Sequence, residues 1–208
     1  MNSVTARDLT WSAKAFVDLV WPAVREALGN GELVPAEAVM NDRMSRDFDM
    51  LASIDGWQVC RPGGIRGIAS RVQKLAAAAR PYNTFTIRYA RTTGAETEFS
   101  KRLKAIEQQE GWIYPHFTVQ AYVTETLDSL TSCAVVRTRD LFEYAKVNIA
   151  ANGGRGDRHS AYMQVNSYDG NQFIVVPWDS LTRDGVWILT PPCQSGRARV
   201  TLVAAALW

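Results

Sequence analysis

Two neighbouring stretches of the chain concentrate charges of opposite sign. From residue 61 to residue 95 there is no Asp or Glu, and the seven cationic side chains are Arg61, Arg66, Arg71, Lys74, Arg80, Arg88 and Arg91. The stretch directly before it carries four aspartates, Asp42, Asp47, Asp49 and Asp55. Either the two stretches pair with each other across the fold, or they form a phosphate-binding face beside a carboxylate site for a metal ion. Both interpretations stay open.

The charge of the whole chain hides this asymmetry. The 208 residues have a formal net charge of only +2, yet residues 61–104 hold 10 basic and 2 acidic side chains. An excess of this kind is typical of surfaces that contact nucleic-acid phosphates, and we expect DNA as the partner. The candidate contacts are Arg66, Lys74, Arg88, Arg91 and Lys101.

Within the basic segment, strand periodicity groups the polar side chains. Residues 54–60 and 65–73 read as two strands joined by the turn Arg61-Pro62-Gly63-Gly64. Alternate residues of a strand share a face, so Arg71 and Gln73 are predicted to point toward one phosphate. Asp55 lies one hairpin away. The plainer alternatives are an ion pair for Arg71 with one of the aspartates, a strand-edge hydrogen bond for Gln73, and a turn at Asp55.

The remaining pattern predicts the elements that position these residues. A helix is expected over residues 10–28, a second from Pro35 to Met44, and a central helix after the capping-box spacing Thr93–Glu96, with Phe99, Leu103 and Ile106 as its buried stripe. A short helix is expected over residues 139–146. Further strands are expected at 84–89, 117–123, 132–137, 162–165, 173–176, 186–189 and 200–205.

These elements predict an α/β or α+β fold in a single domain, 1–208. Residues 1–50 form an N-terminal helical layer and residues 51–150 an α/β core with a mixed sheet and the central helix packed on it. Residues 151–208 form a β-rich extension of the same domain.

The order helix, strand, strand, strand, helix, strand over roughly residues 10–140 resembles the restriction-endonuclease-like, PD-(D/E)xK nuclease core. In that family an acid on one strand and a D/E-x-K tripeptide on the next hold a divalent cation that activates water. Asp55 matches the first acid. On the second strand Ala69 stands at the place of the acid and Arg71 at that of the lysine, and Gln73 is the nearest alternative oxygen ligand.

The resemblance implies a divalent-metal-dependent nuclease, or a nuclease-like DNA-binding protein, of a restriction, repair or mobile-element system. Its Mg²⁺ or Mn²⁺ would be held by Asp55 and Gln73, with Arg71 on the phosphate and a further carboxylate from Glu98 or Glu37. Many nucleases of this class pair to cut two strands, which implies a homodimer.

Two alternatives remain beside this interpretation. Glu98 precedes Lys101 and Arg102 by three and four residues, which is the spacing of an ordinary helix-surface ion pair. The whole basic segment can equally belong to a non-catalytic module that binds nucleic acid or protein without cleaving anything.

Other classes of protein are disfavoured by composition. No apolar run approaches 18 residues, so no membrane span is expected, and the N-terminus lacks the pattern of a signal peptide, which favours a cytoplasmic protein. Three dispersed cysteines and two histidines argue against a disulfide framework and against a Cys/His metal site.

Overall fold

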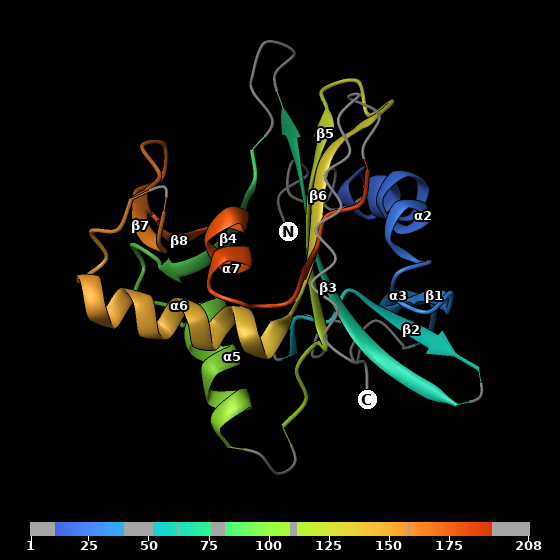
Figure 1. The fold of residues 1–208 in the computed structure, drawn as a ribbon, viewed down its shortest axis with the longest axis horizontal. Coiled ribbons are helices and arrows are strands. Elements are labelled where there is room, and N and C mark those ends of the chain that lie inside the picture. Colours follow the sequence, from blue (N-terminus) through green and yellow to red (C-terminus); the bar gives the residue numbers. More distant parts are fainter. Residues whose placement is uncertain are drawn as a thin grey trace.

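The computed structural model describes residues 11–39, 52–61, 63–75, 82–108, 112–157 and 159–192, which form an α+β fold with two sheets (Figure 1). The larger sheet has six strands in the order β1-β2-β3-β5-β6-β9, and the smaller has three in the order β4-β8-β7. The strands are β1 (Glu32–Pro35), β2 (Gly56–Cys60), β3 (Gly64–Leu75), β4 (Thr84–Ala90), β5 (Phe117–Thr124), β6 (Leu130–Arg137), β7 (Tyr162–Val165), β8 (Gln172–Pro177) and β9 (Ile188–Leu189).

The helices lie on both sides of the larger sheet. Residues 11–24 are helical and include the π-helical turn η1 (Phe16–Val20) and α2 (Trp21–Val24). The others are α3 (Ala36–Val39), α5 (Glu98–Glu107), α6 (Thr138–Asn152) and α7 (Trp178–Arg183). In Figure 1 the N-terminal helical segment covers one face of the larger sheet, while α5, α6 and the smaller sheet lie on the other side.

The predicted hairpin of β2 and β3 is confirmed, and it is antiparallel with Gly56 opposite Ile68. From β3 the chain passes through β4 and α5 and then returns as β5, which pairs with β3 in parallel, so the larger sheet is mixed as predicted. Parallel neighbours need a crossover connection, and α5 lies within it.

Strand alternation divides the interior into two apolar clusters. On β3, Ile68 and Val72 pack with the N-terminal helical segment, whereas Leu75 packs with α5, α6 and the smaller sheet. β5 divides in the same way, with Val119 on the first side and Tyr122 on the second. Period-two burial on both central strands therefore fixes which face each polar side chain of β3 occupies.

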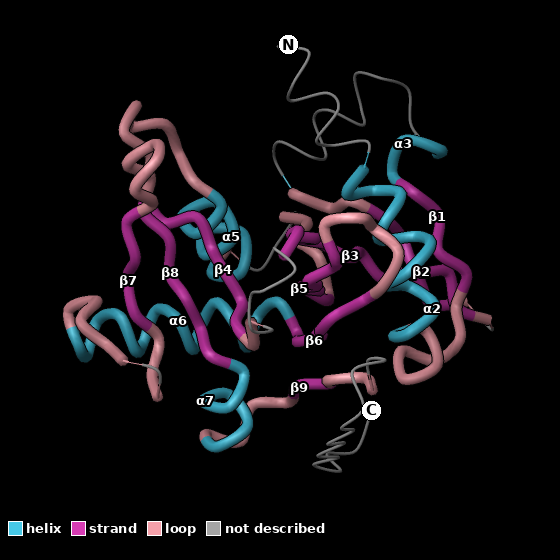
Figure 2. Tube along the Cα trace, turned by 90° about the horizontal axis from the view of Figure 1, so that it is seen from above, coloured by secondary structure: helices cyan, strands magenta, loops and turns pink. Residues whose placement is uncertain are grey.

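One sequence prediction about the sheets is wrong. β4 was expected in the mixed sheet of the α/β core, residues 51–150, but it pairs antiparallel with β8 in the second sheet, from Thr84 opposite Pro177 to Ala90 opposite Gln172 (Figure 2). The partner strand is supplied by the C-terminal β-rich region, about ninety residues later. Local periodicity predicts a strand without saying which strand it pairs with.

Several boundaries also differ. The central helix begins at Glu98, and its capping box is formed by Thr97 and Ser100 rather than by residues 93–96. β1 ends at Pro35, where the second helix was expected to begin, and α3 begins one residue later, at Ala36. The helix predicted at 139–146 extends from Thr138 to Asn152. The rest of the second helix and the strand predicted at 200–205 lie outside the described residues.

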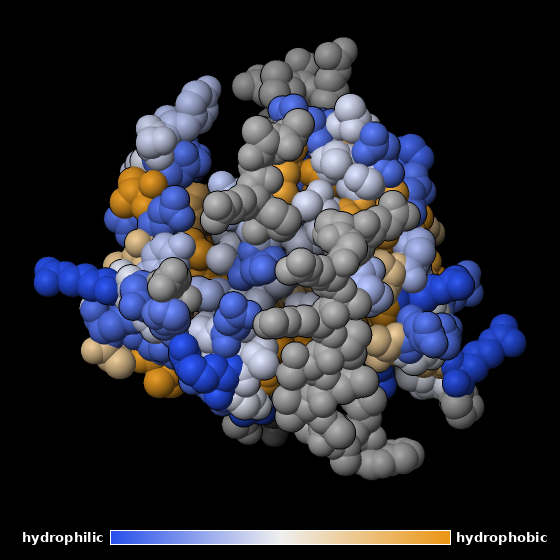
Figure 3. All heavy atoms as spheres, turned by 45° about the horizontal axis from the view of Figure 1, so that its top comes forward, coloured by the Kyte–Doolittle hydropathy of each residue, from blue (hydrophilic) through white to orange (hydrophobic). Residues whose placement is uncertain are grey.

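Within the described part of the chain, no helix is both long and apolar enough to cross a bilayer. Figure 3 shows the apolar side chains of one face as separate patches between hydrophilic ones.

Candidate functional site

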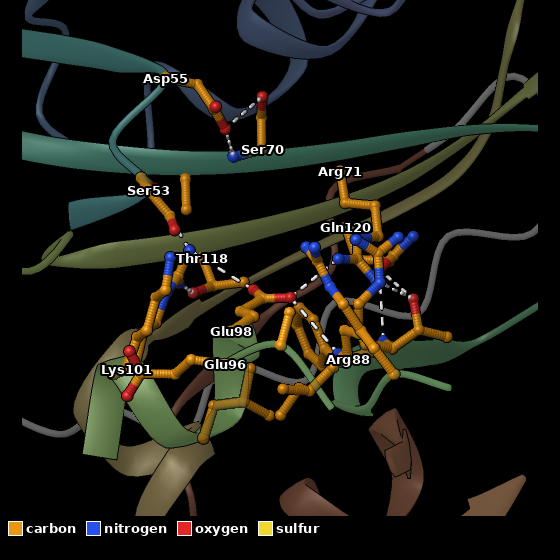
Figure 4. A pocket seen from close by; sticks show the side chains of 18 residues that line it. Ser53, Asp55, Ser70, Arg71, Arg88, Glu96, Glu98, Lys101, Thr118 and Gln120 are labelled. Atoms are coloured by element: carbon orange, nitrogen blue, oxygen red, sulfur yellow. Dashed lines mark hydrogen bonds and ion pairs between the residues drawn. The ribbon is translucent and has the colours of Figure 1, made fainter. Parts of the chain in front are cut away.

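A cavity of about 640 Å³ opens between the larger sheet, β4 and the start of α5 (Figure 4). It brings together predicted residues from β3, β4 and α5 and from the segments directly before β2 and after β4. Three of the predicted catalytic residues line it, namely Asp55, Arg71 and Glu98. Three of the predicted nucleic-acid contacts also line it, namely Arg88, Arg91 and Lys101.

Glu98 is the centre of the charge cluster in this cavity. Its Oε2 lies 2.8 Å from Nη2 of Arg71 and accepts a hydrogen bond from the backbone N–H of Arg88, at 3.4 Å. Its Oε1 lies 3.4 Å from Nη2 of Arg102. The Glu98 side chain is only 18% exposed and that of Arg102 only 5%. Both carboxylate oxygens are therefore engaged by the protein itself.

The two arginines are held by further acceptors. Arg71 donates from Nη1 to the carbonyl and the hydroxyl of Thr86 on β4, at 2.9 and 3.2 Å. Arg102 donates to the Ser53 carbonyl and to Oγ1 of Thr118, at 3.2 and 3.3 Å. The cluster thus joins β3, β4, β5 and α5 across the cavity wall.

These contacts keep Glu98 ionised. Burial raises the pKa of the Glu98 carboxyl, but the charges of Arg71 and Arg102 and the Arg88 N–H outweigh burial, so its pKa lies below the ordinary value. The ion pair with Arg102 expected from the four-residue spacing is confirmed. It lies in the interior rather than on the helix surface, because Arg71 from β3 covers it.

Arg88 and Arg91 are the two arginines of the cavity that Glu98 does not hold in an ion pair. Among the described residues, neither side chain has an ion pair within 4.0 Å, and the buried Nε of Arg88 has no hydrogen-bond partner. The Arg88 guanidinium lies 5.6 Å from the centre of the Phe173 ring. Burial and then repulsion from Arg71 and Arg91 lower the pKa of Arg88. An anion beside the Arg88 guanidinium would offset both its burial and its repulsion from Arg71 and Arg91.

Asp55 lines the cavity where β2 begins. Its Oδ2 accepts hydrogen bonds from the backbone N–H and the hydroxyl of Ser70, at 2.5 and 3.2 Å. In Figure 4 Asp55 and Ser70 lie on the opposite side of the β3 ribbon from Arg71 and Glu98. The turn expected as the alternative for Asp55 is not present, because Asp55 leads directly into β2 and its own N–H donates to the Ile68 carbonyl of β3 at 2.9 Å.

The structure does not bring Asp55 and Gln73 together. Gln73 lies three residues beyond Ser70 on β3, a separation of roughly 10 Å along a strand. Oε1 of Gln73 accepts a hydrogen bond from Nε2 of Gln120 at 3.2 Å. Gln73 is exposed and does not line the cavity. The strand-edge hydrogen bond expected as the alternative for Gln73 is thus present. The predicted metal pair does not share a site.

Other carboxylates do not complete a metal site among the described residues. The side chain of Glu37 lies outside them. The described part of the chain contains no group of three or more His, Cys, Asp or Glu side chains placed to hold one ion.

Arg66 and Lys74 point away from the cavity. Arg66 donates to the Leu28 carbonyl at 3.4 Å and lies 5.8 Å from the Phe117 ring centre. Lys74 lies 4.7 Å from the ring centre of Trp11. Even-numbered residues of β3 face the N-terminal helical segment, while Arg71 faces α5. The basic segment therefore does not form one continuous face, contrary to the expectation of a single surface.

Sequence reasoning missed two residues that organise the cavity. Gln120 is 1% exposed on β5, and its Oε1 lies 3.3 Å from the Thr86 N–H and 3.2 Å from the Thr86 hydroxyl. Arg102 was treated only as a surface partner of Glu98. A glutamine inside a strand with apolar neighbours was the available signal, because buried polar groups require partners.

Comparison with known proteins adds no relative: no family model, no curated protein and no solved structure matches this chain. The resemblance to PD-(D/E)xK nucleases therefore stays a prediction.

Proposed function

We propose that this chain is a nuclease-like DNA-binding protein that holds phosphate groups of DNA in the cavity between β3, β4 and α5. The observation that carries the proposal is the pair Arg88 and Arg91. Both line the cavity, and neither forms an ion pair within 4.0 Å with an acid among the described residues.

Positive charges gathered in a partly buried space repel one another. Five cationic and three acidic side chains line the cavity. Glu98 forms ion pairs with Arg71 and Arg102. Glu96 forms an ion pair at 2.6 Å with Lys104, which does not line the cavity. A guanidinium that is partly removed from water needs a compensating anion, and its planar donors suit phosphate oxygens. A phosphate group supplies that anion.

Divalent-metal-dependent cleavage at the same cavity is the second candidate, because the exposed Asp55 carboxylate also lines the cavity, on the other side of β3 from Arg71. The residues present fit a resident Mg²⁺ or Mn²⁺ poorly. Both Glu98 oxygens face arginines, one Asp55 oxygen is bonded to Ser70, and Gln73 lies elsewhere. Hard cations favour several oxygen ligands, which this set does not provide. We therefore place DNA binding first.

The test is a fluorescence-anisotropy titration of labelled duplex and single-stranded DNA at 50 to 200 mM salt with a chelator present. Arg88→Gln/Arg91→Gln removes two phosphate contacts and should reduce the slope of log K against log salt by about 1.4 to 1.8. Arg66→Gln/Lys74→Gln is the matched control, since it removes the same charge from the opposite face of β3. It should leave the slope close to the wild-type value.

Equal effects of the two double variants would contradict the assignment of the cavity, and absence of DNA binding by the wild-type protein would contradict the function. A parallel incubation of plasmid with Mg²⁺ or Mn²⁺ tests the second candidate. Cleavage that Asp55→Asn abolishes would establish it, and intact plasmid would reject it.

A further inference from the structure

The depth of the cavity bears on which phosphate it receives. Its volume of about 640 Å³ falls within the range of small-ligand sites. The cavity reaches the interior, because three of the residues that line it are at most 1% exposed. These are Phe85, Ile87 and Leu141. A space of this size admits a group of nucleotide dimensions, whereas a rigid duplex can only approach its mouth.

The arginines that line the cavity differ in how deeply they are buried. Arg91 is exposed and Arg88 is half-buried, while the Arg102 side chain is only 5% exposed. Two buried donor atoms in this set, Nε of Arg88 and Nε of Arg102, have no hydrogen-bond partner. Buried donors without partners are rare in folded proteins. An anionic oxygen that enters the cavity would accept a hydrogen bond from Nε of Arg88, the less buried of these two donors.

The charge left uncompensated in the cavity also matches a particular phosphate. Glu98 is shared by Arg71 and Arg102, which leaves Arg88 and Arg91 as two unpaired cations among the described residues. An internal phosphodiester carries a single negative charge, whereas a phosphate monoester carries about −1.5 to −2 at pH 7. Asp55, the remaining acid, lies on the other side of β3 from Arg71 and does not oppose this charge directly (Figure 4).

We propose that the cavity receives the terminal phosphate monoester of a nucleic-acid strand in preference to an internal phosphodiester. This proposal rests on the function proposed above and specifies its ligand. Arg91 meets the phosphate at the mouth, and Arg88 holds it inside, above the Glu98 cluster.

The experiment compares single-stranded oligonucleotides of one sequence that end in a 5′-phosphate, a 3′-phosphate or hydroxyls only, each labelled away from the tested end. A charge-assisted contact to the extra anionic charge should make one phosphorylated form bind about tenfold or more tightly than the hydroxyl form. The preference should disappear in Arg88→Gln and in Arg91→Gln. Because Arg91 is exposed, its variant tests the proposal even if Arg88→Gln does not fold. Arg66→Gln should retain the preference.

The possible outcomes distinguish a failure of the terminal-phosphate proposal from a failure of the proposed DNA binding. If all three oligonucleotides bind equally and Arg88→Gln/Arg91→Gln weakens them equally, DNA binding stands and the terminal-phosphate proposal is wrong. If none binds, both are wrong. If a nucleoside monophosphate competes at the same concentration as the phosphorylated strand, the ligand is a small phosphate monoester, and the assignment to a strand end is overturned.

Discussion

On one face of β3, Arg71 reaches across to Thr86 and Glu98, whereas on the other face Arg66 and Lys74 rest against the Leu28 carbonyl and the Trp11 ring. Both faces draw on the same basic stretch of sequence. On the N-terminal side each cation is used in packing. On the cavity side several arginines share one carboxylate, and two have no described counter-ion. The number of cations in a segment therefore does not define a binding surface, since strand alternation divides them.

The largest expected effect comes from removing the carboxylate on the cavity side. Glu98→Ala leaves the buried Arg102 and the half-buried Arg71 without their counter-charge, which should cost about 3–5 kcal/mol of unfolding free energy in urea denaturation. Glu107→Ala on the same helix is the control, because the exposed pair of Glu107 with Lys146 is worth about 0–1 kcal/mol. Similar losses for the two variants would show that the cluster is not a buried one.

The same carboxylate should make the protein sensitive to acid. The folded pKa of Glu98 lies below its ordinary value of 4.5, so its contribution to stability is complete above about pH 4.5 and is lost as the pH falls through the folded value. Denaturant midpoints measured from pH 6 down to pH 3 should decline more steeply for the wild type than for Glu98→Gln. Parallel declines would mean that other acids dominate this range.

A smaller effect is expected at His116, which lies beside Arg66. Its Nδ1 accepts the Gly67 N–H at 3.0 Å, and burial, followed by the Arg66 charge, lowers the pKa of His116 below 6.5. Losing this acceptor should cost about 1 kcal/mol in His116→Ala. The contribution is present above pH 6.5 and disappears as the pH falls through the lowered folded value. A variant as stable as the wild type at pH 8 would contradict this role.

The smallest expected effect is at Lys74. Lys74→Ala removes a cation that lies over the Trp11 ring, which should cost about 0.5–1 kcal/mol in thermal or chemical unfolding. Its affinity for DNA should stay at the wild-type value. A loss of affinity equal to that of Arg91→Ala would erase the difference between the two faces of β3.

Local patterns predicted the elements well where one face of a strand or helix is buried. The β2–β3 hairpin, the alternation of β5 and the central helix all follow from periodicity within about a dozen residues. The pairing of β4 with β8 could not be read in this way, because it joins segments about ninety residues apart. Strand pairing depends on long-range register and packing, which local periodicity does not encode.

The candidate site was predicted in part. Asp55, Arg71 and Glu98 do line one cavity, together with Arg88, Arg91 and Lys101. The spacing of Glu98 and Arg102 indicated their pair, but the sequence could not show that Arg71 would occupy the other oxygen of Glu98, since Arg71 lies on β3, 27 residues earlier in the chain. Gln73 was misplaced relative to Asp55 because sharing a strand face with Arg71 does not bring it near the start of β2.

DNA is proposed to occupy the cavity side of β3 and not the side that faces the N-terminal helical segment. Hydrogen–deuterium exchange with and without a short single-stranded DNA tests it on two exposed connections, residues 91–96 at the cavity mouth and the β2–β3 turn that carries Arg61. We expect DNA to slow exchange in residues 91–96 and to leave exchange in the β2–β3 turn unchanged. Slower exchange at the β2–β3 turn, with none at residues 91–96, would contradict it.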